Sequence, residues 1–136
     1  MLDNVHQIIA GVVLLSVIGI AYGGTFLLKV TRGSVPANEL QQRFFRAGHA
    51  HAGVLVILGL LVMLLTQLND VAGLWQTLSL GVLVAAILMP GGFFLSVVGR
   101  DPGRPNRLIA LLWAGATALV VGLASAGLGL IVAGTN

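Results

Sequence analysis

IIAGVVLLSVIGIAYGGTFLL, residues 8–28, contains no charged side chain and is followed directly by Lys29. Three more apolar segments follow it along the chain, at residues 47–65, 71–98 and 108–133. Each has about the 20 residues that a helix needs to cross a hydrocarbon layer of ~30 Å. The sequence therefore predicts an all-α membrane protein, a four-transmembrane-helix antiparallel bundle with spans near residues 5–29, 44–67, 71–99 and 105–133.

The composition agrees with a membrane protein. Only 8% of the 136 residues are charged, whereas a soluble domain has about a quarter. The four spans use most of the chain, so we expect residues 1–136 to form a single transmembrane domain. The start of the chain lacks the basic region of a signal peptide, and we expect the first span to be retained. Cysteine is absent, which excludes disulfide exchange, thiolate catalysis and cysteine metal sites.

The positive charges predict the orientation of the chain. All seven lysines and arginines flank the first and third connections between spans, at Lys29, Arg32, Arg43, Arg46, Arg100, Arg104 and Arg107. Because Lys and Arg resist translocation, both connections should be cytoplasmic. Both termini and the turn at Asn69 should then lie outside, in the plasma membrane of a bacterium. Contact of these bases with anionic lipid head groups explains the net charge of +3, so we expect no nucleic-acid partner.

Turn-forming residues predict where the helices begin. Either Asp3 or Asn4 is suited to cap the first helix. Pro36 is suited to open a helix, with residues 38–46 as an interfacial prelude to the second span. Pro105 suits the first turn of the fourth span.

Pro90 lies inside the third span, followed by two glycines. A proline removes one backbone donor and clashes with the carbonyl four residues earlier, so we expect a kink there. In transporters such a break often marks a binding site, although a plain packing kink is the simpler interpretation.

Small residues recur at steps of three and four along the fourth span, at Gly115, Ala118, Gly122, Ser125 and Gly129. In lipid, such a seam lets two helix backbones approach closely. We expect the contact to lie inside the bundle or, as the sharper alternative, between copies in a homo-oligomer. A shorter version, Gly19-x-x-x-Gly23, lies in the first span. We expect self-association or docking to a membrane-protein partner.

The candidate polar or ligand site is His49, His51, Tyr22 and Pro90. Residues two apart on a helix differ by about 200°, so His49 and His51 cannot face the same side. Small and polar neighbours place His49 toward protein, with Tyr22 as a candidate partner. Leucines and a valine place His51 toward lipid or a second subunit. No predicted span contains an acidic residue, which weighs against a proton pump or cation antiporter.

The run Arg46-x-x-His49 at a helix start resembles a heme-ligand segment in the second span of heme–copper oxidases and nitric oxide reductases. That resemblance implies heme ligation at this position, but the other histidines of such an enzyme are missing. His6 is expected at the opposite membrane face, and no carboxylate or thiolate lies near His49 or His51. We therefore predict no metal site within one subunit and no cofactor, with heme as the alternative.

These features favour a small non-enzymatic integral membrane protein, either oligomer-forming or an accessory subunit of a larger complex. One alternative is a minimal oligomeric channel or transporter with a polar path near His49 and the Pro90 break. A second alternative is a heme- or metal-binding redox subunit that uses His49 or His51. The sequence indicates no substrate, partner or stoichiometry.

Overall fold

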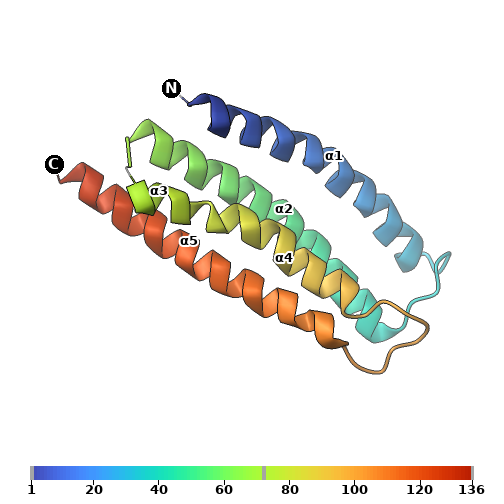
Figure 1. Cartoon of the computed structure of the whole chain (residues 1–136). Helices are drawn as coiled ribbons and strands as arrows, with labels where there is room; N and C mark the ends of the chain where they lie inside the picture. The colour runs from blue at the N-terminus through green and yellow to red at the C-terminus, as the bar shows by residue number, and fades with distance from the viewer. Residues whose placement is uncertain (1, 72, 136) are drawn as a thin grey trace.

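The computed structural model describes residues 2–71 and 73–135, which form helices and no strands. The elements are α1 (Asn4–Thr31), α2 (Glu39–Leu68), α3 (Gly73–Ser79), α4 (Gly81–Leu95), the 3₁₀ turn η1 (Arg107–Ile109) and α5 (Ala110–Gly134) (Figure 1). Four helical stretches are long and apolar enough to cross a membrane: α1, α2, α3 with α4, and η1 with α5. The prediction of four apolar spans is therefore confirmed.

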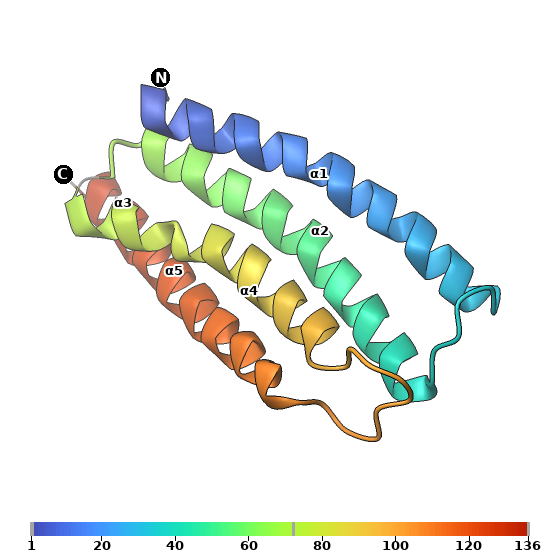
Figure 2. The ribbon, with the colours of Figure 1, turned by 45° about the vertical axis from the view of Figure 1, so that its right-hand side comes forward.

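The helices do not form an evenly closed bundle. α2, α4 and α5 pack around a shared core, in which Leu55 of α2 and Met89 of α4 are buried beside Leu112 of α5. α1 lies on the outside of α2 (Figure 2), and among the described elements it packs against α2 alone. The fold is thus a three-helix core with a fourth helix attached along one side.

The seam of small residues on α5 is a close helix–helix contact, as predicted. A Cβ placed on Gly122 would lie 2.7 Å from the backbone nitrogen of Val82, and a Cβ placed on Gly81 would lie 2.6 Å from the carbonyl oxygen of Ala118. The other seam glycines are approached as tightly: Gly115 meets Met89 of α4, and Gly129 meets Trp75 of α3 and Val71, which lies before α3. Ser125 is buried in the same contact. Because α3 and α4 occupy this face, a second copy cannot use it, and that alternative for the seam is wrong.

Side-chain caps fix the helix starts. The Asp3 carboxylate accepts the backbone N–H of His6, so Asp3 is the cap of α1. Asn38 and Gln41 form a reciprocal capping box at the start of α2. Residues 39–46 therefore belong to α2 itself, and the prediction that Pro36 opens this helix is wrong. The interfacial position of residues 38–46 remains a prediction. Asn106 caps η1, just after Pro105.

The third span is interrupted at Leu80, between α3 and α4. The carbonyl of Leu80 accepts from Leu83 at 2.9 Å and from Val84 at 3.1 Å, a tightened turn. Pro90 is buried inside α4, and the helix continues through it to Leu95. The expected bend of the axis at Pro90 remains a prediction.

Both termini lie at one end of the molecule, called here the terminal end (Figure 1). All seven bases are exposed around the two connections at the opposite, basic end. Asn38 bridges these connections by donating to the Asp101 carboxylate at 2.8 Å and to the Pro102 carbonyl at 2.9 Å. The buried Gln41 amide donates to the carbonyls of Val97 and Gly99, both at 3.1 Å. Both basic connections are thus held together at the same end.

Candidate functional site

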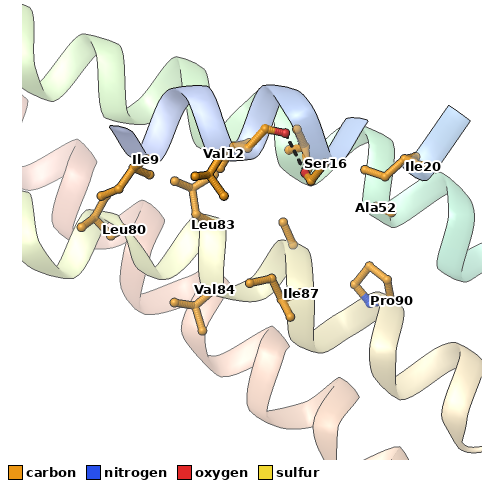
Figure 3. Close-up of a pocket in the computed structure, with 13 residues that line it drawn as sticks. Ile9, Val12, Ser16, Ile20, Ala52, Leu80, Leu83, Val84, Ile87 and Pro90 are labelled. Atoms are coloured by element: carbon orange, nitrogen blue, oxygen red, sulfur yellow. Dashed lines mark hydrogen bonds between the residues drawn. The ribbon is translucent and has the colours of Figure 1, made fainter. Parts of the chain in front are cut away.

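A groove of about 520 Å³ runs between α1 and α4, with α2 as its floor (Figure 3). We call it the α1–α4 groove. Its lining is apolar apart from one side chain, Ser16, whose hydroxyl already donates to the carbonyl of Val13 at 2.6 Å. The lining residues are Ile9, Val12, Val13, Ser16 and Ile20 of α1, Ala52 and Val56 of α2, and Leu80, Leu83, Val84, Ala86, Ile87 and Pro90.

The groove exists because α1 and α4 both pack on α2 but not on each other. Ala52 and Val56 are the α2 side chains that form its floor, and Ala52 has the smaller side chain of the two. Leu80 and Pro90 mark the two ends along α4 (Figure 3). Ten residues separate them, which is about 15 Å at 1.5 Å per residue.

His49 lies one turn beyond Ala52, on the side of the basic end. Its ring packs against two consecutive glycines of α1: a Cβ would lie 3.7 Å from Nδ1 at Gly23 and 3.6 Å from Nε2 at Gly24. The prediction that His49 faces protein is confirmed. Its ring nitrogens make no hydrogen bond within the described residues 2–71 and 73–135, and the side chain is only partly buried.

Three phenylalanine rings connect α1, α2 and α4 next to His49. Phe45, one turn before His49 on α2, contacts Phe26 of α1 edge-on with ring centroids 5.3 Å apart. It also stacks on Phe94 of α4 at 5.7 Å. We call these three rings the aromatic bridge. It joins α1 to α4 through α2.

His51 lies on the other side of α2. Its ring packs on Phe93 of α4 with centroids 5.0 Å apart, and Nδ1 lies 2.8 Å from the carbonyl oxygen of Ala47. Leu55 and Val62, on the same face of α2, are buried. The prediction that His51 faces lipid or a second subunit is therefore wrong. The reason is that α1 and α4 cover α2 from two sides, so opposite faces of this helix both meet protein.

Tyr22 does not join the site. Its side chain is 73% exposed on the outer face of α1. The hydroxyl makes no hydrogen bond within the described part of the chain, so the predicted pairing with His49 is wrong. Only the backbone carbonyl of Tyr22 is used, by the Thr25 hydroxyl at 2.7 Å.

A polar contact at the terminal end holds the start of α1 to the end of α2. The His6 Nδ1 atom lies 2.8 Å from the Asp3 carboxylate and 3.1 Å from the Gln67 amide nitrogen. The hydrogen bond from the His6 backbone N–H, followed by the one from its ring, holds the pKa of Asp3 below its ordinary value. His6 was expected at this membrane face, but its contact with Gln67 was not predicted from the sequence.

The positions of His49 and His51 do not favour a metal site that they share. His49 and His51 lie on opposite sides of α2, against α1 and α4 respectively. Among the described residues, no group of three His, Cys, Asp or Glu side chains is placed to share a metal ion. The groove can instead accommodate an apolar chain, and His49 lies one turn from Ala52 in its floor.

Comparisons of the chain with protein-family models, curated proteins and solved structures found no match. Of the predicted site residues, Pro90 lines the groove and His49 lies one helical turn from Ala52 in its floor, whereas Tyr22 and His51 lie elsewhere. The aromatic bridge was missed, although the pairs Phe44-Phe45 and Phe93-Phe94 stand near the basic connections in the sequence.

Proposed function

We propose that this chain is a small non-enzymatic integral membrane protein that self-associates, with a second copy packing on the outer face of α1. We further propose that the basic connections are cytoplasmic, with both termini outside the plasma membrane of a bacterium. The observation that carries the proposal is that α1 packs on α2 alone among the described elements. Its opposite face is left free to contact another helix.

The outer face of α1 has the composition of a helix-packing surface. Gly11, Leu15, Ile18, Gly19 and Tyr22 follow one another at helical spacing, and the three large side chains are exposed. Nothing lies within 4 Å of a Cβ placed on Gly11 or Gly19. Small residues beside large ones let a neighbouring helix approach closely in lipid. The same face can serve both sides of a twofold contact, in which each protomer offers glycines to its partner's large side chains.

Tyr22 gives a second reason to expect a protein neighbour. If α1 is centred in a hydrocarbon layer of ~30 Å, Tyr22 lies about 8 Å inside its boundary. A tyrosine hydroxyl buried in an apolar medium normally has a hydrogen-bond partner, because burying the hydroxyl without a hydrogen bond costs free energy. In a parallel twofold contact, the two Tyr22 hydroxyls come to the same depth and can pair.

The alternatives have less support. A channel or transporter needs a polar path, whereas the α1–α4 groove has an apolar lining. A redox subunit that uses His49 or His51 would need its further ligands from another subunit, because the two rings face different helices. An accessory subunit would use the same outer face of α1 for a different protein, and the experiment below separates it from a homodimer.

Cysteine cross-linking in native membranes tests the proposal, since the chain has no cysteine of its own. Ile18→Cys on α1 and Val120→Cys on α5 are a matched pair, because these side chains are 68% and 67% exposed. We expect oxidation to link two Ile18→Cys chains and to leave Val120→Cys monomeric. A link from position 18 to a different protein would favour the accessory subunit. Equal, weak linking at both positions would contradict association through α1.

A further inference from the structure

We infer that the α1–α4 groove and His49 together bind a single-chain amphiphile with an uncharged, flat, hydrogen-bonding head, the chemistry of a lipid quinone. The apolar chain lies in the groove between Leu80 and Pro90. The head lies at His49, next to the aromatic bridge. This site goes beyond the proposed self-association, which uses a different face of α1.

The shape and lining of the groove suit an extended apolar chain. The groove has a volume of about 520 Å³ and runs about 15 Å along α4. A slender extended chain fits it and would cover the exposed flanks of Val84 and Ile87.

His49 supplies the group that a head would recognise. If α2 is centred in a hydrocarbon layer of ~30 Å, His49 lies about 8 Å inside the boundary. Its ring nitrogens make no hydrogen bond within the described residues, and in this medium an unmet polar group is costly. A neutral imidazole has one N–H donor and one acceptor. A carbonyl at the head of a ligand would accept the donor and satisfy it.

The surroundings of His49 favour a head that is flat and uncharged. Phe45 lies one turn before His49 on α2 and contacts Phe26 and Phe94, and aromatic rings pack well against another flat ring. The groove lining contains no charged side chain. An ionised head at this depth would lose its water without gaining a counter-charge from the lining.

Binding should be independent of self-association. Val12, Ser16 and Ile20 turn toward the groove and α2, whereas Ile18 and Tyr22 occupy the opposite face of α1. Loss of a dimer would therefore leave the groove in place, and filling the groove would leave the dimer face in place. The two proposals can fail separately.

The test uses the purified protein in a mild detergent and three decyl probes: a benzoquinone with a decyl chain, decanoate and decane. Native mass spectrometry measures the fraction of chains that carry each probe. We expect one decyl-benzoquinone per chain and weaker retention of the other two. His49→Leu should weaken decyl-benzoquinone binding by about tenfold, as expected for the loss of one hydrogen bond, and should not change decane retention.

Two matched variants test the groove itself. Val84→Trp fills the groove and should abolish binding, whereas Val120→Trp adds the same bulk to the outside of α5 and should bind like wild type. Both valines are substantially exposed, so neither change is expected to unfold the protein. Binding that is equal for decyl-benzoquinone and decane, or equal in wild type and His49→Leu, would overturn the head assignment. Undiminished binding by Val84→Trp, or stronger binding of decanoate, would overturn the site.

Discussion

The imidazole of His49 lies on the bare backbone of Gly24: a Cβ at residue 24 would be 3.6 Å from Nε2. This distance is an ordinary van der Waals contact, so alanine fits there and a larger side chain does not. Besides this contact, α1 is joined to α2 by the Phe26–Phe45 ring pair and by the polar contact between His6 and Gln67. The attachment of α1 therefore depends on a few identifiable residues.

Gly24→Leu should push α1 away from α2. Overpacking of this kind costs about 1–3 kcal/mol, and we expect a lower unfolding midpoint in detergent. Gly24→Ala should melt close to wild type. Gly53→Leu is the control on α2, because nothing lies within 4 Å of a Cβ at Gly53. A Gly24→Leu protein as stable as the Gly53→Leu control would mean that α1 does not need this contact.

The seam between α4 and α5 gives a second pair of variants. Gly122→Ala would place a Cβ 2.7 Å from the Val82 backbone nitrogen, so the two helices must move apart. We expect a loss of about 1–3 kcal/mol in the free energy of unfolding. Gly127→Ala on the same helix meets nothing within 4 Å and should be neutral, or stabilising by about 0.5–1 kcal/mol. The free energies of unfolding of the two proteins can be compared by reversible denaturation. Equal stability would show that α4 and α5 can move apart at little energetic cost.

The orientation in the membrane is tested by labelling single cysteines. Ser34 lies in a basic connection and Asn69 at the end of α2, and both are exposed. Because basic connections stay in the cytoplasm, an impermeant reagent added outside intact cells should label Asn69→Cys and not Ser34→Cys. External labelling of Ser34→Cys would reverse the proposed topology.

The bend at Pro90 is tested by a distance between spin labels. Leu78 and Leu95 are exposed on α3 and α4 on either side of the proline. Pro90→Ala restores the missing donor, so we expect the distance between labels at these positions to lengthen. An unchanged distance would indicate that packing against α2 and α5 holds α4 straight despite the proline.

The four spans could be predicted because length and hydrophobicity alone decide whether a helix crosses a membrane. The close helix contact at the Gly122 seam could also be predicted, since small residues repeated at steps of three and four are typical of such contacts. Which helices pack against which could not be predicted. Apolar residues cover every side of α1, so no pattern indicates that only one side meets α2.

The error at His51 has a related cause. The 200° separation from His49 was sound, but it predicts a lipid-facing side chain only for a helix with one covered face. α2 lies between α1 and α4, so His51 meets Phe93. The groove itself has no signal in the sequence, because it arises from the absence of contact between α1 and α4.

Self-association through α1 is tested most directly by the native mass of the purified protein in mild detergent. The chain mass is 14.0 kDa, and we predict a species of twice that mass for wild type. Gly19→Leu, which fills an open position on the outer face of α1, should return the protein to a folded species of 14.0 kDa. A wild-type protein that remains at 14.0 kDa across concentrations, with no co-purifying partner, would contradict the proposed function.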